Sequence, residues 1–561
     1  MTYPEIFRKA QSRCASLLDG QASKVVISSW ADDPSAPAVA RSFQEVVGRQ
    51  GLNAAIVAAG PSGYDGLEPV VLIEKPDRPA VFYHHMTAEK AAILADAYLA
   101  GENPRPDMAL CAMAEKGLRS IPAASQLALF RLQTRIALRS CGLVDPEEID
   151  ASLVRAHGYE GLHKALQKAP LGVIDEVRAS GLRGRGGAGF PVADKWEACG
   201  EAKGKEKYVV CNCLDSDPAA RTGRLILEGD PHCMLEGMLI AAYAVGAARC
   251  IICVGSCHSS AIRRVRRALD QMRSHGLLGR GILGSPFSVD AEVAEIEQSL
   301  VSGEETALLE ALVGRQAMPY LRPPYPAQGG LKGSPTVVSS AETLADVSAI
   351  LQREAAWFSS IGTGKSKGSK VVTLSGDITR AYTVEVPFGT SLRALVEEIG
   401  GGVPNGRGIK ALQVGGPTGT FVGPEALDRT IDYETAESMG AIVGSGTIKV
   451  FANDGCGVEI AEETVSYIQA QSCGKCVFCR EGTYQMADIL KGISEKVGSP
   501  GDLELLDELA GQMRLGCVCS LGKGAAHAVA SSMRVFREDY EAHLKGKGCP
   551  SRKEPAAGPG E

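Results

Sequence analysis

A compact group of cysteines constrains this chain more than any other feature of its sequence. The stretch SCGKCVFCREG spaces Cys473, Cys476 and Cys479 as C-x2-C-x2-C, and CVCSLG follows with Cys517 and Cys519. Soft thiolates at this spacing hold three corners of a four-iron cubane, while a more distant cysteine supplies the fourth. We therefore predict a 4Fe-4S cluster, with Cys517 as the spare cysteine. The predicted ligands of the cluster are Cys473, Cys476, Cys479 and Cys519.

Two alternative roles for these cysteines stay open at this point. Zinc is a competitor, because four-cysteine zinc sites also use C-x2-C pairs. Such sites usually contain two pairs, whereas here a triplet precedes one later partner. Buried cysteines without a ligand are the second alternative. Five of the 17 cysteines lie between Cys473 and Cys519, and this crowding favours a metal cluster.

Length and composition limit the class of protein. A chain of 561 residues predicts three or four domains. Its net charge of −7 argues against a nucleic-acid partner. The longest apolar stretch, residues 238–248, falls short of the roughly 20 residues that a bilayer crossing needs. The first residues lack the apolar core of an export signal. We therefore expect a cytoplasmic location without direct membrane insertion.

Hydrophobic periodicity predicts an α/β and α+β multidomain fold. Apolar segments within residues 24–106 follow the order β-α-β-β-β-α, which suits a thioredoxin-like domain. An alternating strand followed by a helical pattern at 382–399 favours a β-grasp-like domain, and Leu506, Leu509 and Met513 share one helical face. The predicted parts are a thioredoxin-like domain (1–115), an α/β domain (116–361), a β-grasp-like domain (370–450), a helical bundle with the iron–sulfur cluster (451–544) and a disordered tail (545–561).

A glycine-rich loop lies in the second of these parts. GLRGRGGAGFP (181–191) places five glycines in nine residues, directly before a predicted helix start. Glycines allow backbone N–H groups to approach a phosphate or a flat ring without interference from a Cβ atom. The loop is not the G-x-G-x-x-G of a strand-turn-helix unit, so an ordinary flexible loop remains the alternative.

Several motifs together give the chain a family resemblance. The glycine loop and the cysteine box are accompanied by GEETALLEAL (303–312), RPPYPAQGGLKGSPT (322–336) and AETLADV (341–347). From about residue 161 to 536, this order resembles the NADH-binding flavoprotein subunit family. That family includes a subunit of respiratory complex I and soluble relatives in NAD-linked formate dehydrogenases and in NAD-coupled or electron-bifurcating hydrogenases. The N-terminal domain resembles the thioredoxin-like 2Fe-2S subunit that several relatives carry.

The resemblance implies an NADH dehydrogenase-type flavoprotein subunit with FMN, NAD(H) and one 4Fe-4S cluster. Residues 116–361 would form a Rossmann-like domain that binds FMN and NADH. The implied partners are a 2Fe-2S thioredoxin-like subunit, an iron–sulfur relay subunit and a catalytic subunit. The implied cofactor-binding residues are Gly184, Gly186, Gly187, Lys195, Asn212, Asp215, Gly303, Glu304 and Glu305, with Phe190 and Tyr325 as aromatic faces for NADH; Asp217 and Glu305 are the implied catalytic residues.

Parts of the nicotinamide and flavin pocket depart from the family pattern. Asp217 stands where the family has a longer glutamate, Leu300 replaces a tyrosine, and two serines, Ser339 and Ser340, replace paired asparagines. These changes keep a second interpretation open, in which the chain is a structural or relay subunit. Such a subunit keeps the 4Fe-4S cluster but has lost nicotinamide binding, and with it flavin binding in the extreme case.

Cysteines elsewhere receive two further interpretations. The N-terminal domain has no cysteines at the strand ends where the family places 2Fe-2S ligands, which read ISSW (27–30) and AGPSG (59–63), so we predict no cluster there. Cys250, Cys253 and Cys257 follow a C-x2-C-x3-C-H pattern that could ligate an extra metal. We favour a buried strand, in which Cys250 and Cys253 face opposite sides.

Overall fold

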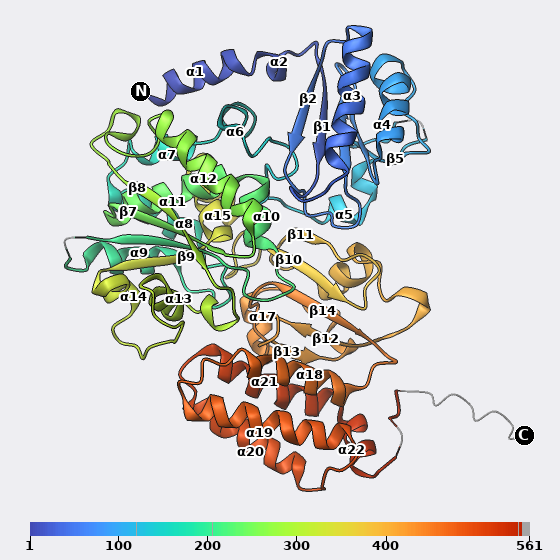
Figure 1. The fold of residues 1–561 in the computed structure, drawn as a ribbon, viewed down its shortest axis with the longest axis vertical. Helices are drawn as coiled ribbons and strands as arrows, with labels where there is room; N and C mark the ends of the chain where they lie inside the picture. Colours follow the sequence, from blue (N-terminus) through green and yellow to red (C-terminus); the bar gives the residue numbers. More distant parts are fainter. Residues whose placement is uncertain (119, 205, 548, 552–561) are drawn as a thin grey trace, which may run out of the picture.

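The computed structural model describes residues 1–118, 120–204, 206–547 and 549–551. These residues form a mixed α/β multidomain structure with three sheets and a C-terminal group of helices (Figure 1). The predicted multidomain character is therefore confirmed. Among the described residues, no helix is both long and apolar enough to cross a bilayer.

The first sheet contains the N-terminal strands in the order β2-β1-β3-β4-β5. β1 and β2 are parallel, and the other neighbouring pairs are antiparallel. The predicted β-α-β-β-β-α order is present, but α1 and α2 precede it and β5 follows it. The elements are α1 (Tyr3–Arg13), α2 (Ala15–Leu18), β1 (Ser23–Ser28), α3 (Ala36–Gln50), β2 (Ala54–Ala59), β3 (Val70–Glu74), β4 (Ala80–Tyr83), α4 (Ala88–Leu94), the π-helix η1 (Ala95–Ala100) and β5 (Ala109–Met113).

The second sheet is fully parallel, with strand order β8-β7-β6-β9. Its strands are β6 (Tyr208–Cys213), β7 (Arg249–Gly255), β8 (Asp290–Ile296) and β9 (Thr336–Ser340). β6 and β7 read as nearly continuous apolar runs because helices cover the sheet. The helices of this part of the chain are α6 (Ile149–Ala156), α7 (Glu160–Ala165), α8 (Pro170–Ser180), α9 (Val192–Glu201), α10 (Thr222–Gly229), α11 (Pro231–Val245), α12 (Ser259–Ser274), η3 (Ile282–Gly284), η4 (Val301–Gly303), α13 (Glu305–Leu312), α14 (Pro326–Gly329), η5 (Leu331–Gly333), α15 (Ala341–Arg353) and α16 (Ala355–Ser359). Two short helices precede them: η2 (Ala124–Gln126) contacts β5 of the first sheet, and α5 (Ala128–Arg131) packs in the core of the third sheet.

The third sheet is mixed and has the order β11-β10-β14-β12-β13. β10 pairs with β14 in parallel, and the other pairs are antiparallel. The predicted strand and helix at 382–399 correspond to β11 and a π-helix. The elements are β10 (Ser369–Gly376), β11 (Thr383–Pro387), η6 (Ala394–Ile399), η7 (Pro404–Gly406), β12 (Ile409–Val414), β13 (Thr420–Val422), η8 (Pro424–Ala426), α17 (Tyr433–Ser438) and β14 (Thr447–Ala452).

In the part of the chain that the structure describes, five helices follow the third sheet and pack below it in the view of Figure 1. They are α18 (Gly457–Ala470), α19 (Val477–Ser494), α20 (Asp502–Gly516), α21 (Ser520–Val535) and α22 (Arg537–Leu544). The predicted face with Leu506 and Met513 is buried in the core of this bundle.

Two residues of the predicted disordered tail (545–561) contact the helical bundle. Cys549 packs against the bundle core, and the Ser551 hydroxyl donates a hydrogen bond to Asp539 at 3.2 Å. These contacts place Cys549 and Ser551 against the bundle, where Ser551 provides a hydrogen-bond partner for the buried Asp539 carboxylate. The remainder of the predicted tail, 552–561, lies outside the described residues.

Candidate functional site

The predicted pocket residues gather at the carboxyl edge of the parallel sheet. Asn212 lies near the end of β6 and Ser340 at the end of β9, and these positions are paired in register. The Asn212 side chain donates a hydrogen bond to the Gly303 carbonyl at 2.9 Å, which attaches the segment after β8 to the same edge. Ligands of open parallel sheets bind at this edge. The sheet therefore brings the glycine loop, the strand ends and the 303–305 turn together.

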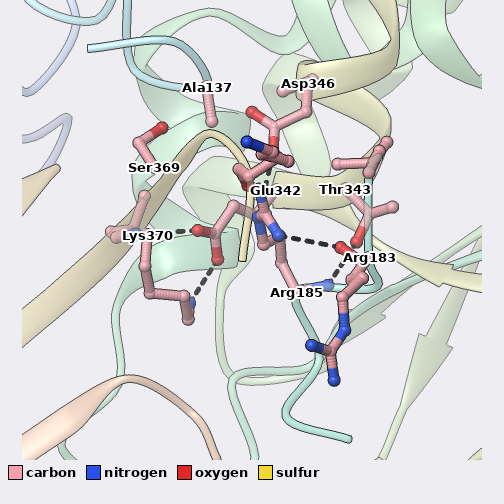
Figure 2. A network of polar contacts seen from close by, with 12 residues as sticks. Ala137, Arg183, Arg185, Glu342, Thr343, Asp346, Ser369 and Lys370 are labelled. Carbon is pink, nitrogen blue, oxygen red and sulfur yellow. Dashed lines mark hydrogen bonds and ion pairs between the residues drawn. The ribbon is translucent and has the colours of Figure 1, made fainter. Parts of the chain in front are cut away.

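The glycine loop is held from inside by the side chain between its glycines (Figure 2). Arg185 is buried, and its backbone N–H donates to the Thr343 hydroxyl at 2.8 Å. Its guanidinium forms an ion pair with Asp346 at 3.2 Å. A Cβ atom built on Gly186 meets only Ser340 Cβ at 4.0 Å. Arg185 thus anchors the loop, while the space beside Gly186 stays open.

A second buried ion pair extends this network to the third sheet (Figure 2). Glu342, in the first turn of α15, pairs with the Lys370 ammonium on β10 and accepts the N–H of Val371 at 2.7 Å. The pairs Lys370–Glu342 and Arg185–Asp346 both include a residue of α15. The position of the glycine loop is therefore fixed by contacts from a neighbouring sheet.

Breaking the inner ion pair should destabilise the chain strongly. In Arg185→Gln, the Asp346 carboxylate loses its cationic partner while it stays buried, at a cost of about 3–5 kcal/mol. We expect the apparent melting temperature to fall by roughly 6–20 °C in differential scanning calorimetry. The double variant Arg185→Met/Asp346→Leu should recover much of this loss.

The control for this prediction is Arg178→Gln on α8. Arg178 forms exposed ion pairs with Asp175 and Glu197, and such pairs contribute about 0–1 kcal/mol. An equal fall in melting temperature for Arg178→Gln and Arg185→Gln would contradict the anchoring role of Arg185.

Alternating charges line the edge next to the glycine loop. The Lys195 ammonium lies 3.1 Å from Glu305 and 3.2 Å from the Val338 carbonyl. Arg322 pairs with Glu305 at 3.0 Å and also with Glu304. The sequence patterns did not single out Arg322, although it begins the RPPYP motif. Lys195 and Arg322 give this edge two cations suited to phosphate groups.

Two aromatic side chains remain exposed beside this edge. Phe190 and Tyr325 are each 54% exposed, so solvent reaches both aromatic rings. Phe190 lies just before α9 and Tyr325 caps α14, and these two helices pack together. Exposed aromatic faces of this kind are suited to stacking against a flat ring.

Three predicted pocket residues form hydrogen bonds with other groups of the chain through their carboxylates. Asp215, predicted to bind cofactor, is half-buried and accepts the N–H groups of Gly223 and Arg224 at 2.8 Å each. It therefore stabilises the first turn of α10, and burial raises the pKa of its carboxyl. Glu304 caps α13 by accepting two backbone N–H groups, because the chain needs an acceptor at this helix start. For Asp215 and Glu304, the structure indicates a structural role.

Asp217, predicted to be catalytic, is the third of these residues and lies buried between the second and third sheets. Its carboxylate accepts the Ser445 hydroxyl at 2.6 Å and the N–H of Ala219 at 3.0 Å. A Cβ atom on Gly416 would approach Asp217 to 2.4 Å. Both oxygens have partners and the side chain is enclosed, so direct contact with a nicotinamide ring is disfavoured here.

Four of the five cysteines of the cluster box lie at the ends of α19, α20 and α21, and Cys473 lies in the loop between α18 and α19. Cys476 and Cys519 are the residues just before α19 and α21, and Cys479 lies in the first turn of α19. A small cavity is lined by Cys473, Cys476, Cys479 and Cys519, but not by Cys517. Helix N-termini favour thiolates and anionic clusters, because their N–H groups are unpaired.

Hydrogen bonds and burial set the thiol electrostatics. A hydrogen bond from Cys517 is the main cause that lowers the pKa of Cys479 to about 6. Burial raises the pKa of Cys519 to about 11, opposed by the N–H groups of Leu521 and Gly522. A Cβ atom on Gly522 would lie 2.5 Å from the Cys517 sulfur. Glycine at 522 thus allows the start of α21 to approach the cysteines.

One segment contacts both the cysteine cavity and the charged edge. Val301 and Pro319 line the cavity, and the Lys475 ammonium donates to the Pro319 carbonyl at 2.7 Å. The same segment carries Glu305, which pairs with Lys195. Residues 301–319 therefore form the wall between the two sites.

The residues present suit the groups that the sequence implied. For FMN, the open space at Gly186, the cation of Lys195 and the Ser340-capped start of α15 offer an anion site. For a four-iron cluster, four thiol side chains line one cavity, and three of them lie at helix starts. The chemistry of both donor sets therefore fits.

Two further cysteine predictions concern regions outside this site: the strand ends of the first sheet that lack 2Fe-2S cysteines, and Cys250, Cys253 and Cys257 in the second. The strand-end loop that lacks 2Fe-2S cysteines packs on α10: a Cβ atom on Gly60 would lie 2.2 Å from the Glu228 carbonyl, and Arg224 covers the Trp30 ring at 4.5 Å. Cys250 and Cys253 belong to different core clusters, as expected for opposite faces of β7, and Cys257 is exposed.

Two family models match parts of the chain. Residues 177–349 match the Nuo51 FMN-binding domain, and residues 459–543 match the NADH-ubiquinone oxidoreductase-F iron-sulfur binding region. The first match covers the glycine loop and the charged edge, and the second covers the cysteine box.

Curated relatives and solved structures extend this similarity. The chain is 42% identical over 419 residues to the NADP-reducing hydrogenase subunit HndC of Solidesulfovibrio fructosivorans, covering 75% of this chain and 85% of the relative. It is 39% identical over 394 residues to an NADH-quinone oxidoreductase F-type subunit of Rhizobium meliloti (strain 1021), covering 70% and 94%. A crystal structure of an NAD+-reducing [NiFe]-hydrogenase in the H2-reduced state contains a chain that matches with a TM-score of 0.66 and 26% identity, covering 98% of this chain and 90% of that one.

Proposed function

The chain belongs to the family of NADH-quinone oxidoreductase F-type subunits, and from this membership we propose that it transfers electrons between NAD(H) and partner subunits of a redox complex. It is an FMN- and 4Fe-4S-dependent subunit of the NADH dehydrogenase type. FMN supplies the chemistry that converts a two-electron hydride into single electrons. In the complex, electrons pass either from NADH to the partner subunits or from the partner subunits to NAD+.

The observation that carries this proposal is the shared wall of residues 301–319. The wall carries Glu305 on the flavin side and Val301 and Pro319 on the cysteine side. A donor site and an acceptor site separated by one short segment are suited to the passage of electrons. The glycine loop, Lys195 and Asn212 hold the flavin side, while Cys473, Cys476, Cys479 and Cys519 hold the cluster side.

We also propose finer assignments for the other parts. Residues 1–115 are a thioredoxin-like domain without a cluster, 370–450 a β-grasp-like domain and 451–544 the iron–sulfur bundle. Because the N-terminal domain packs its strand-end loops on α10, it serves assembly. The partners are an iron–sulfur relay subunit, a 2Fe-2S subunit and a catalytic subunit, and the complex is cytoplasmic.

A relay function without nicotinamide is the second candidate. One observation in its favour is that Asp217 is enclosed and has a partner for each carboxylate oxygen. The other is that Leu300 stands where the NADH-binding flavoprotein subunit family has a tyrosine. In this case the cluster remains, but electrons enter from another subunit.

Glu305→Gln tests the nicotinamide site. We propose that the Glu305 carboxylate accepts hydrogen bonds from ribose hydroxyls, in exchange for its partners Lys195 and Arg322. A hydrogen bond to a charged group contributes about 1.5–3 kcal/mol, so the KM for NADH should rise roughly tenfold or more. The measurement is the rate of anaerobic flavin bleaching against NADH concentration.

Glu310→Gln provides the matched control on the same helix. Glu310 forms an ion pair with Arg315 at the exposed side of α13, away from Lys195 and Arg322, and its replacement should leave the KM unchanged. FMN and iron contents are measured for both variants. A Glu305→Gln variant that keeps the wild-type KM with full FMN content would exclude Glu305 from nicotinamide binding.

A further inference from the structure

Three metal-ligating side chains meet away from the cysteine box. Cys456 lies just before α18, His543 in the last turn of α22, and Cys549 in the C-terminal segment. One ligand atom of each lies within 4.8 Å of the others. Cys456 and His543 are buried and Cys549 is half-buried. Within the described residues, no other group of three or more such side chains converges this closely.

The imidazole of His543 is oriented as a ligand. Its Nδ1 lies 3.1 Å from the Ile493 carbonyl and 3.2 Å from the Ser494 carbonyl, so Nδ1–H donates to the end of α19. This leaves the lone pair of Nε2 free, and Nε2 lies 3.3 Å from the Cys456 sulfur. Histidine ligands in metal sites are commonly fixed by such a hydrogen bond from their other ring nitrogen.

The C-terminal segment is fastened so that Cys549 reaches the same point. Ser551 contacts the Lys410 ammonium and donates to Asp539 at 3.2 Å. Asp539 in turn accepts the N–H of Gly457, the residue after Cys456, at 2.7 Å. The same polar cluster therefore holds both cysteine-bearing segments.

We propose that Cys456, His543 and Cys549 bind one zinc ion, with water in the fourth position. Two thiolates and one imidazole suit zinc among the common divalent metals. At zinc–ligand distances of about 2.0–2.3 Å in a tetrahedron, ligand atoms lie roughly 3.5–3.8 Å apart. The observed separations need only small adjustments to reach this geometry.

This zinc site is separate from the iron–sulfur site. None of its three residues lines the cysteine cavity. The ion joins the start of α18 to the end of α22 and to the C-terminal segment, which the sequence predicted as a tail. Its role is to hold the last helix and this segment against the bundle.

The test is zinc and iron analysis of the full-length chain by inductively coupled plasma mass spectrometry. We expect about one zinc per chain in the wild type, in addition to the iron of the cluster. Cys549→Ala and His543→Ala should each lose at least nine tenths of the zinc with iron unchanged. Cys111→Ala, which alters a buried cysteine of the first sheet, should keep the zinc, as should Cys476→Ser/Cys519→Ser.

Three results would overturn the proposal. The first is a wild-type chain that holds no zinc after growth with added zinc and purification without chelator. The second is an intact mass two hydrogens lower with a Cys456–Cys549 cross-linked peptide, which would indicate a disulfide. Should His543→Ala fail to fold, Cys549→Ala decides the matter, because Cys549 lies outside every helix. Retention of zinc in Cys549→Ala would also overturn it.

Discussion

The double variant Cys476→Ser/Cys519→Ser should contain less than one iron per chain, compared with about four in the wild type. Hydroxyl oxygens are harder and weaker ligands for this cluster than thiolates, and the variant loses two of the four thiols that line the cavity. The measurement is iron and acid-labile sulfide in chains purified without oxygen. The visible absorbance of the cluster should disappear in parallel.

Cys517→Ser is the matched control for the cluster prediction. Cys517 is a neighbour of Cys479 but does not line the cavity, so this variant should keep about four irons. Full iron in the double variant, or loss of the cluster in Cys517→Ser alone, would contradict the ligand assignment.

Gly186→Leu should empty the flavin site, lowering FMN from about one per chain to nearly none. Only Ser340 Cβ lies within 4.0 Å of a Cβ atom at this position, so a leucine side chain enters the space that we assign to FMN. Gly186 does not have a positive φ, and the variant should therefore fold without backbone strain. Released flavin is measured by its fluorescence after denaturation.

Gly200→Leu, on α9, controls for the added side chain. Nothing lies within 4 Å of a Cβ atom at Gly200, and its φ is also not positive. This variant should retain full FMN. Equal flavin content in the Gly186→Leu variant and the wild type would place FMN elsewhere or nowhere on this chain.

Local patterns carried the sequence predictions that the structure confirms. The β-α-β-β-β-α order and the face of Leu506 and Met513 follow from hydrophobic period and burial, which are properties of neighbouring residues. The cysteine box is local as well, because three of its cysteines span only seven residues, from 473 to 479. The family resemblance supplied the rest of the pocket.

Long-range partners explain what the sequence could not predict. Cys456 and Cys549 are 549 − 456 = 93 positions apart, so no spacing rule connects them with His543. Arg185 lies within a glycine-rich pattern that suggests a flexible loop, although its side chain forms a buried pair with Asp346. Asp215 and Glu304 accept backbone N–H groups at the starts of α10 and α13, where unpaired N–H groups need acceptors. The sequence patterns did not indicate these contacts, and the cofactor-binding role of both residues stays a prediction.

The central claim is that NADH reduces this chain through FMN and the cluster. It is tested most directly by adding NADH, without oxygen, to a preparation with full FMN and iron content. The account predicts bleaching of the flavin absorbance together with the electron paramagnetic resonance signal of a reduced 4Fe-4S cluster. Absence of bleaching with both NADH and NADPH would contradict it, and electrons would then enter this subunit from a partner.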